Sequence, residues 1–391
     1  MKNNTEYMYR NQYLKEYLDL DKKRYCIDRD LTVKSVDKAI ILPTRRDQDR
    51  FWGGGGALDE SGIYVKESQI RHAFGKPYSL DSGETIREID EDVIYIPCIP
   101  NHWGHFLLDV VSRLWFALEN TSRIAFCISG FSNGKLIPNM QEFFELLGYD
   151  EQRLIIIDKP TRFHRVMIPE PSLCQDNQWY FHPKYMETVN RVKKAVLESE
   201  GSKAFKKYNK IYFTRRKLET NWHSEAGERI IEDTFRRNGF QVFSPELLSL
   251  KEQILLVSSC KEVASLSGTI PHNIIFANKD SHFIILSRTA YPNSLQVMID
   301  HMAGIDHTII DVYHRVKKPN RYGSGPFWVE YNRNLKRYMD DHWENAKYPG
   351  VISVFLNRGI GAIHYGIGLF WKHIKKMEWL KSIYRIIRGR K

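Results

Sequence analysis

Short apolar runs alternate with stretches of helical periodicity through the second half of the chain. Runs of strand length occupy residues 211–214, 240–243, 263–266 and 282–286. One helical stretch spans residues 225–237 and ends at the stop signal Asn238-Gly239, and a second begins after Ser249, a favourable N-cap residue. Strands that alternate with helices predict βαβ units and a parallel sheet.

Another apolar run, at residues 93–97, leads into a segment rich in histidine. A helix is expected after the break at Pro97, and on it His105 and Asp109 share one face because they are four residues apart. Open α/β sheets bind their ligands at the carboxyl ends of their strands. His105 and Asp109 are therefore the candidate general base, with His102 as a lesser candidate. The alternative is a helix whose polar residues cap its first turn and hydrogen-bond internally.

A second group of polar residues follows the strands of the second half. Arg215 and Arg216 come directly after the run at 211–214, and Ser267-Gly268-Thr269 break the chain between a strand and an expected helix start. Backbone N–H groups and the helix dipole at such a break favour an anion, and arginines at a neighbouring strand end can clamp a phosphate. The pattern predicts a phosphate site.

Over roughly residues 50–290 the chain resembles glycosyltransferase family 61. The resemblance rests on an ordered set of motifs: Gly55-Gly56-Ala57-Leu58-Asp59, His105-Phe106 with Asp109, Arg215-Arg216, Gly239-Phe240, Pro245-Glu246 followed by Leu248-Ser249, Gln253, and the loop that ends in Asn273. The resemblance implies an α/β fold of two facing Rossmann-like domains, the arrangement called GT-B. It also implies an inverting, metal-independent transfer of a sugar from a nucleotide-sugar donor to an acceptor hydroxyl, with no cofactor besides that donor.

Two positions depart from the family pattern. Where many members carry a histidine this chain has Ser267, and His272 is a possible replacement. The acidic partner of the two arginines is either Glu219 or Glu225, and the spacing leaves both open.

With the resemblance, the candidate residues acquire roles. The catalytic candidates are His105, Asp109 and His102. The donor-binding candidates are Arg215, Arg216, Ser267, Gly268, Thr269, His272, Asn273 and Gln253. We expect an acceptor-side Rossmann-like domain at 1–205, a nucleotide-sugar-binding one at 206–315, a helical segment at 316–350 that braces the first domain, and a tail at 351–391.

The net charge of +11 is concentrated in that tail, where nine basic residues accompany one acid. The rest of the chain is close to neutral, which argues against nucleic acid as a partner. Apolar residues at helical spacing and flanking tryptophans predict a basic amphipathic helix that lies on an anionic membrane surface. We therefore expect a cytoplasmic protein, peripheral on the inner face of the membrane, that acts on a glycan or lipid-linked acceptor in capsule or other surface polysaccharide synthesis.

The remaining composition narrows the chemistry. The five cysteines are scattered, so neither a disulfide framework nor a zinc site is expected, and a reducing compartment is favoured. Asp-x-Asp occurs at 19–21 and 90–92, in positions that do not suit a diphosphate-bound metal, and no metal is expected. The competing interpretation is a noncatalytic nucleotide- or carbohydrate-binding component, or a membrane scaffold, of a glycan assembly complex.

Overall fold

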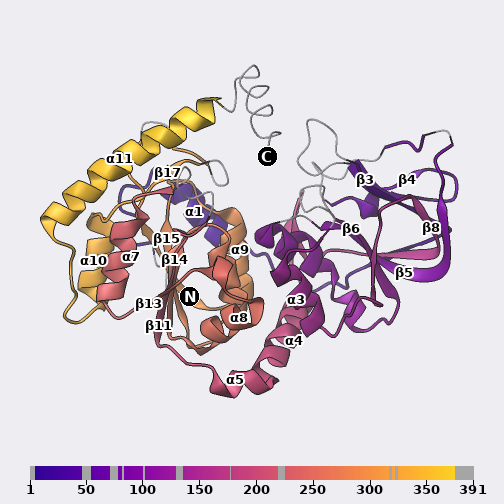
Figure 1. Cartoon of the computed structure of the whole chain (residues 1–391), viewed down its shortest axis with the longest axis horizontal. Coiled ribbons are helices and arrows are strands. Elements are labelled where there is room, and N and C mark those ends of the chain that lie inside the picture. The colour runs from indigo at the N-terminus through magenta and orange to yellow at the C-terminus, as the bar shows by residue number, and fades with distance from the viewer. Residues whose placement is uncertain are drawn as a thin grey trace, which may run out of the picture.

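Two β-sheets with their covering helices form the two halves of the molecule (Figure 1). The computed structural model describes residues 5–45, 54–70, 78–81, 83–99, 102–128, 135–176, 178–218, 225–316, 319–321 and 325–374. Within them strands and helices mix along the chain, and the predicted α/β class is confirmed.

The first sheet has eight strands and mixed direction. Its strands are β1 (Val33–Asp37), β2 (Ile40–Arg45), β3 (Gly54–Leu58), β4 (Tyr64–Val65), β5 (Arg87–Ile99), β6 (Arg123–Ile128), β7 (Leu154–Ile156) and β8 (Thr161–Pro169). The order is β4-β3-β2-β8-β5-β6-β7, with β1 paired to β8. The strands β8, β5, β6 and β7 are parallel, whereas β1 to β4 pair antiparallel. A Rossmann-like arrangement in this half is therefore limited to the four parallel strands.

The second sheet has five strands, and all of them are parallel. They are β11 (Lys210–Phe213), β13 (Gln241–Phe243), β14 (Glu262–Leu266), β15 (His282–Ser287) and β16 (Asp306–Asp311), in the order β13-β11-β14-β15-β16. Alternate residues enter different apolar clusters: Phe283 and Ile285 face one side, and Ile284 and Leu286 the other. This order is that of a doubly wound sheet. Such sheets bind ligands at the point where the strand order reverses, which here lies between β11 and β14.

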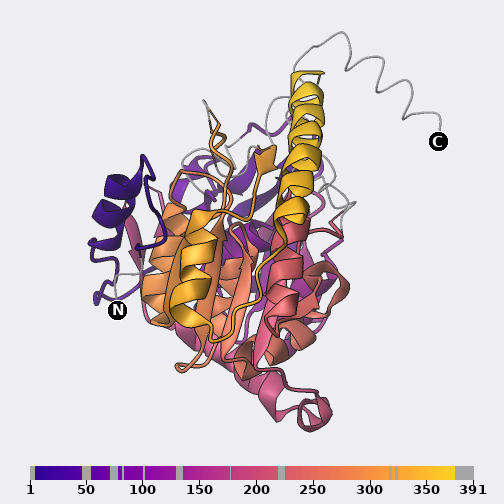
Figure 2. The same ribbon diagram turned by 90° about the vertical axis from the view of Figure 1, so that its left-hand side faces the viewer.

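Helices cover both faces of the second sheet and one side of the first (Figures 1 and 2). The α-helices are α1 (Leu14–Asp21), α2 (Trp103–His105), α3 (Pro138–Leu146), α4 (Lys184–Glu198), α5 (Glu200–Ala204), α7 (Glu228–Arg237), α8 (Leu250–Ser259), α9 (Ser294–Ala303), α10 (Arg333–His342) and α11 (Val351–Ile374). The shorter turns are η1 (Lys66–Ser68), η2 (Phe106–Val110), η3 (Val111–Arg113), η4 (Phe116–Leu118), η5 (Pro245–Leu247) and η6 (Ile270–Phe276). Two small ladders, β9 (Leu173–Gln175) with β10 (Trp179–Phe181) and β12 (Glu225–Ala226) with β17 (Phe327–Trp328), complete the described elements.

One apolar cluster runs through both halves. It joins Phe106 and Phe143 of the first half to Ile254 and Ile274 of the second. α3 and α4 pack against α8, and α4 also contacts η6. The two sheets therefore share a core.

Several predicted boundaries shift. The helix expected from residue 225 begins at Glu228, because Glu225 and Ala226 pair with β17 and Gly227 takes a φ of 89°. The N-cap at Ser249 is confirmed, and its side chain forms a capping box with Glu252.

The N-terminal segment and α10 both pack on the second sheet. α1 contacts α9, and the Asn11 amide donates to Asp311 of β16, although residues 1–205 were assigned to the first domain. α10 was expected to brace the first domain, and this is wrong. Its apolar face, Leu335 with Tyr338 and Met339, joins the apolar cluster on the outer face of the second sheet, because that face needs cover beside α7.

α11 lies across the outside of the second half and projects beyond it (Figure 2). It contacts β12, β17 and α7 through one face that includes Gly361, whose helix backbone lies against the Trp328 ring. Its outward face is apolar and exposed: Val351, Ile352, Phe355, Leu356, Ile360, Ile363, Ile367 and Phe370. In the part of the chain covered by the structure, no helix has the length and apolarity needed to cross a bilayer. The predicted basic residues from 375 onward lie outside the described residues.

Candidate active site

The segment that follows β5 changes its helical winding after one turn. His102 precedes α2, and α2 passes directly into η2, which is a π-helix. Such turns are rare and occur frequently at functional sites. Nδ1 of His105 lies 3.3 Å from Oδ2 of Asp109, and the carboxylate is more deeply buried, with side chains 32% and 6% exposed. The structure thus brings the predicted pair together.

Two further histidines lie near this pair. The His102 ring packs edge-on against the His105 ring, with centroids 5.1 Å apart. Desolvation, then the charges of His105 and Arg215, lowers the pKa of His102 to about 4, although part of its surface is exposed. Burial lowers the pKa of His272 to about 4 against the opposing hydrogen bond with Gln296, and the charges of His102 and His105 add to the lowering. His102 and His272 are therefore neutral near pH 7.

A buried network fixes the tautomer of His272. Nε2 of Gln296 donates to Oδ1 of Asp300 at 2.7 Å and to the carbonyl of Pro271 at 3.3 Å. The amide oxygen of Gln296 therefore faces Nδ1 of His272, 2.7 Å away, and accepts a proton from it. Only Nε2 of His272 remains to accept a hydrogen bond from elsewhere.

Asn273 and Gln253 connect the two halves. The indole N–H of Trp103 donates to Oδ1 of Asn273 at 3.0 Å, and the Asn273 amide donates to Oε1 of Gln253 at 3.2 Å. Gln253 is buried and also donates to the carbonyl of Pro245 at 3.0 Å. These two predicted donor-binding side chains thus hold the histidine segment against the second sheet.

Thr269 lies at the same junction. A side chain added to Gly104 would place its Cβ 3.1 Å from Cγ2 of Thr269, so any other residue would require Thr269 to shift by a few tenths of an ångström. The helix expected after Thr269 is the seven-residue 3₁₀ segment η6. Its dipole is shorter than that of an α-helix of several turns, and an anion here depends more on side-chain charge.

That charge comes from two arginines held by one buried carboxylate. Nε of Arg215 donates to both oxygens of Glu225 at 2.7 Å, and Nη1 of Arg288 donates to Oε1 of the same group. The side chains of Arg215, Arg288 and Glu225 are 17%, 9% and 1% exposed. Of the two acids that the sequence left open, Glu225 is the partner, while Glu219 lies outside the described residues.

Both guanidiniums end at Gly268. A Cβ on Gly268 would lie 3.4 Å from Nη1 of Arg215 and 3.4 Å from Nη2 of Arg288, and the residue adopts a φ of 148° that disfavours any side chain. Ser267 supports the turn, since its hydroxyl accepts from the Arg288 backbone N–H at 3.1 Å. We call Arg215, Arg288, Glu225 and Gly268 the arginine clamp.

Arg216 is not part of the clamp. Its Nη1 donates to Oε1 of Glu232 at 3.3 Å, and it lines a separate pocket of about 530 Å³ that also includes Lys217 and Phe243. Consecutive residues beyond a strand end point in different directions, which explains why two adjacent arginines separate.

A second buried acid lies under Arg215. Glu228 accepts from the Tyr212 hydroxyl at 3.1 Å and from the Arg215 backbone N–H at 3.0 Å. Burial, then the charge of Glu225, raises the pKa of Glu228 to about 7. The clamp therefore rests on a carboxyl group that is only partly ionised at neutral pH.

Sequence reasoning missed Arg288. It follows β15 directly, as Arg215 follows β11 after one residue, and β14 with Gly268 lies between these strands. The sequence did contain a signal for Arg288, namely a basic residue directly after a buried strand of a parallel sheet.

The arrangement places two cations at the crevice of the second sheet and an imidazole–carboxylate pair, with the carboxylate buried, on the segment that follows β5. The cations suit a phosphorylated ligand or leaving group, and the pair suits proton removal from a hydroxyl. Within the described ranges, no three His, Cys, Asp or Glu side chains gather closely enough to hold a metal ion.

Residues 103–284 match the family model described as Glycosyltransferase 61. The matched segment includes His105, Asp109, the arginine at 215, Glu225 and the loop at 267–273, and it ends four residues before Arg288. No curated protein matches the chain. Residues 103–284 thus form a glycosyltransferase family 61 domain, and the protein is a glycosyltransferase.

Proposed function

We propose that this glycosyltransferase moves a sugar from a nucleotide-sugar donor to a hydroxyl of a glycan or lipid-linked acceptor, with inversion and without a metal ion. The observation that carries the proposal is the convergence of Arg215 and Arg288 on Gly268, in the loop whose Thr269 lies against Gly104 of the segment that carries His105 and Asp109. Transfer to a hydroxyl needs both a base for the acceptor and charge stabilisation for the departing nucleoside diphosphate.

The arginine clamp supplies the charge stabilisation. Glu225 neutralises one of the two guanidinium charges, so the clamp retains about one net positive charge in a buried site. As the bond to the donor diphosphate breaks, negative charge grows on the leaving oxygen, and preorganised N–H groups there lower the barrier. The guanidiniums thereby take the role that a divalent cation has in metal-dependent transferases.

His105 and Asp109 supply the base. The acceptor O–H transfers its proton to one member of the pair as its oxygen attacks the anomeric carbon, with the other member orienting or stabilising it. A single displacement of this kind inverts the anomeric centre and needs no covalent intermediate. His102 and His272 are neutral near pH 7 and serve as hydrogen-bonding neighbours.

The two halves then correspond to the two facing domains of a GT-B transferase. We assign acceptor binding to the half within residues 1–205 and donor binding to residues 206–315, whose doubly wound sheet places the clamp at its switch point. Ser267, Gly268 and Thr269 form the turn on which the donor phosphates rest. Gln253 and Asn273 act behind it by fixing its position.

α11 supports attachment to a membrane. Its outward face carries exposed apolar side chains, and the sequence beyond it adds seven of the tail's basic residues. Buried apolar area and attraction to anionic lipid, about 1 kcal/mol per basic residue, both favour an anionic bilayer surface. A transferase on the inner face of the cytoplasmic membrane would reach lipid-linked acceptors, which suits surface polysaccharide synthesis.

The test is a thermal-shift screen against UDP, GDP, CDP, ADP and CMP in the presence of EDTA. A nucleotide at a hundredfold excess over its dissociation constant adds about 2.7 kcal/mol to the free energy of unfolding, so a binder raises the midpoint by several degrees. We expect Arg215→Ala and Arg288→Ala to abolish the shift, because each removes one guanidinium from the phosphate site.

Arg216→Ala is the matched control, since it removes a neighbouring arginine outside the clamp and leaves the shift intact. Each clamp variant keeps one arginine on Glu225, so the fold survives. A shift that requires a divalent cation would contradict the metal-independent mechanism. The absence of any shift would contradict nucleotide binding itself.

A further inference from the structure

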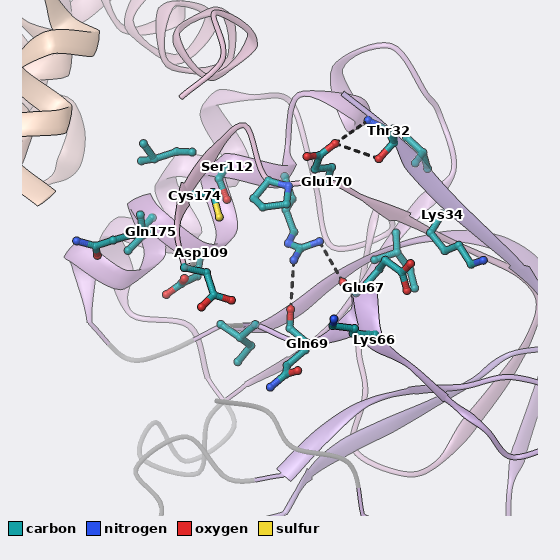
Figure 3. A pocket seen from close by; sticks show the side chains of 18 of the residues that line it. Thr32, Lys34, Lys66, Glu67, Gln69, Asp109, Ser112, Glu170, Cys174 and Gln175 are labelled. Carbon is teal, nitrogen blue, oxygen red and sulfur yellow. Dashed lines mark hydrogen bonds between the residues drawn. The ribbon is translucent and has the colours of Figure 1, made fainter. Parts of the chain in front are cut away.

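One pocket of the first half has no assigned role so far. It has a volume of about 810 Å³, and its walls come from the start of β1, from η1, from η2 and η3, and from the chain between β8 and β9. Figure 3 shows its lining, with Asp109 and Gln175 at one end in this view and Lys34 at the other. Asp109 therefore faces this pocket while it contacts His105.

A buried arginine fixes the pocket to the catalytic segment. Arg113, 5% exposed, donates to the backbone carbonyls of Pro169, Gln69 and Glu67. It belongs to η3, which directly follows the π-helix that carries Asp109. The Arg113 side chain thus ties the η1 wall and the end of β8 to the segment that carries Asp109. These hydrogen bonds fix the position of the pocket walls with respect to Asp109.

The lining is polar and balanced in charge. Its cationic residues are Arg29, Lys34, Lys66 and Arg113, and its acidic residues are Glu67, Asp109, Glu170 and Asp176. Glu170 is already satisfied by Arg29, Thr32 and Tyr180, which makes it part of the wall. Gln69 and Gln175 add amide donors and acceptors.

This chemistry fits one class of ligand. Sugar hydroxyls both donate and accept hydrogen bonds, so mixed carboxylates and amides suit them. An acyl chain would leave these groups unpaired, and a polyanion such as a nucleotide would find no excess positive charge. The volume lies within the usual range for small-ligand sites.

We propose that this pocket is the acceptor site and that it binds the terminal sugars of a neutral glycan, with the attacking hydroxyl at Asp109. The proposal rests on the proposed function for the identity of the reaction. The hydroxyl proton passes to the His105–Asp109 pair, and the acceptor oxygen forms the new bond to the anomeric carbon. The bond from that carbon to the diphosphate breaks, and its electron pair leaves with the nucleoside diphosphate at the arginine clamp.

Saturation-transfer NMR with neutral disaccharides tests the site without knowledge of the donor sugar. Maltose, cellobiose, lactose and N,N′-diacetylchitobiose are the probes, with methyl glucuronide as an anionic comparison. We expect at least one disaccharide to bind in preference to the glucuronide. The double variant Gln69→Ala/Gln175→Ala should weaken that binding by about tenfold or more, because two hydrogen-bonding groups near Asp109 are lost.

Gln178→Ala is the control, since Gln178 is exposed, lies three residues from Gln175 and does not line the pocket. Should the double variant unfold, Gln175→Trp, which fills the pocket, replaces it. Three outcomes would overturn the proposal. The wild type and the pocket variants could bind the disaccharides equally well, no disaccharide could bind the wild type, or the protein could prefer methyl glucuronide. The nucleotide screen tests the donor site separately from the pocket. If the pocket variants keep the thermal shift with the nucleotide but the disaccharide data contradict the pocket, only the acceptor-site proposal fails and the proposed transferase function stands.

Discussion

At the scale of single residues, burial distinguishes two His–Asp pairs of the structure. His105 and Asp109 meet at a pocket, with the carboxylate almost covered. His164 and Asp92 form a pair of 2.7 Å on the surface, with side chains 56% and 37% exposed. Solvent screens the second pair, whereas the first has a buried carboxylate and adjoins space for a substrate.

This contrast sets the catalytic prediction. We expect His105→Ala and Asp109→Ala each to lower turnover by about 10²–10⁴-fold, the usual effect of losing a general base, while the nucleotide thermal shift is kept. His164→Ala is the matched control and should leave turnover unchanged. Steady-state transfer assays with the nucleotide sugar identified by the screen measure the effect. Near-normal turnover in both site variants would remove the pair from the mechanism.

At the scale of elements, α11 depends on one close approach. Gly361 faces the Trp328 ring, and a Cβ there would lie 2.6 Å from Nε1 of Trp328. The ring cannot easily yield, because it stacks on His314 with centroids 3.6 Å apart and contacts Tyr365 on its other flank. Gly366 of the same helix has open space around its Cα. The two glycines therefore have opposite expected responses to substitution.

We expect Gly361→Ala to loosen the attachment of α11 by about 1–3 kcal/mol, the usual penalty of overpacking. Gly366→Ala should strengthen the helix by about 0.5–1 kcal/mol, since alanine has the higher helix propensity. Limited proteolysis of the connection at residues 343–350 measures both, with faster cleavage expected for the first variant. Equal rates in the two variants would mean that Gly361 does not set the contact.

At the scale of the whole molecule, the shared apolar cluster holds the two halves together without a ligand. Trp103, Asn273 and Gln253 add a polar connection beside it. The histidine segment and the loop at 267–273 are therefore held together in a preformed arrangement. α11 meanwhile keeps the apolar side chains of its outward face exposed.

That outward face gives the last prediction. We expect the protein to sediment with vesicles of phosphatidylcholine and phosphatidylglycerol, and Phe355→Asp or Ile360→Asp to abolish sedimentation while turnover on a water-soluble acceptor persists. A carboxylate on this face would have to be buried at the lipid–water interface, and its desolvation cost offsets the free energy that burial of the apolar side chains provides. Ile63→Asp is the control, because Ile63 and Ile360 are both 65% exposed. If the α11 variants sedimented with vesicles as the wild type does, the helix would not bind the lipid surface. The same conclusion would follow if the substitutions abolished self-association of the protein and left vesicle binding unaffected.

The amino-acid sequence by itself determined what depends on local spacing. Hydrophobic period predicted four of the five strands of the second sheet, all except β16. The four-residue interval paired His105 with Asp109, and the ordered motifs identified the family. Such features involve residues close in the chain, whose geometry follows from helix and strand periods.

Only the tertiary structure decided which distant side chains meet. Arg288 joins Arg215 because β15 lies beside β14, next to β11, although the two arginines are far apart in sequence. Arg216 diverges from its neighbour, α10 covers the second sheet, and Arg113 assembles the pocket around Asp109. Strand order, register and side-chain direction set these contacts, and local periodicity does not encode them.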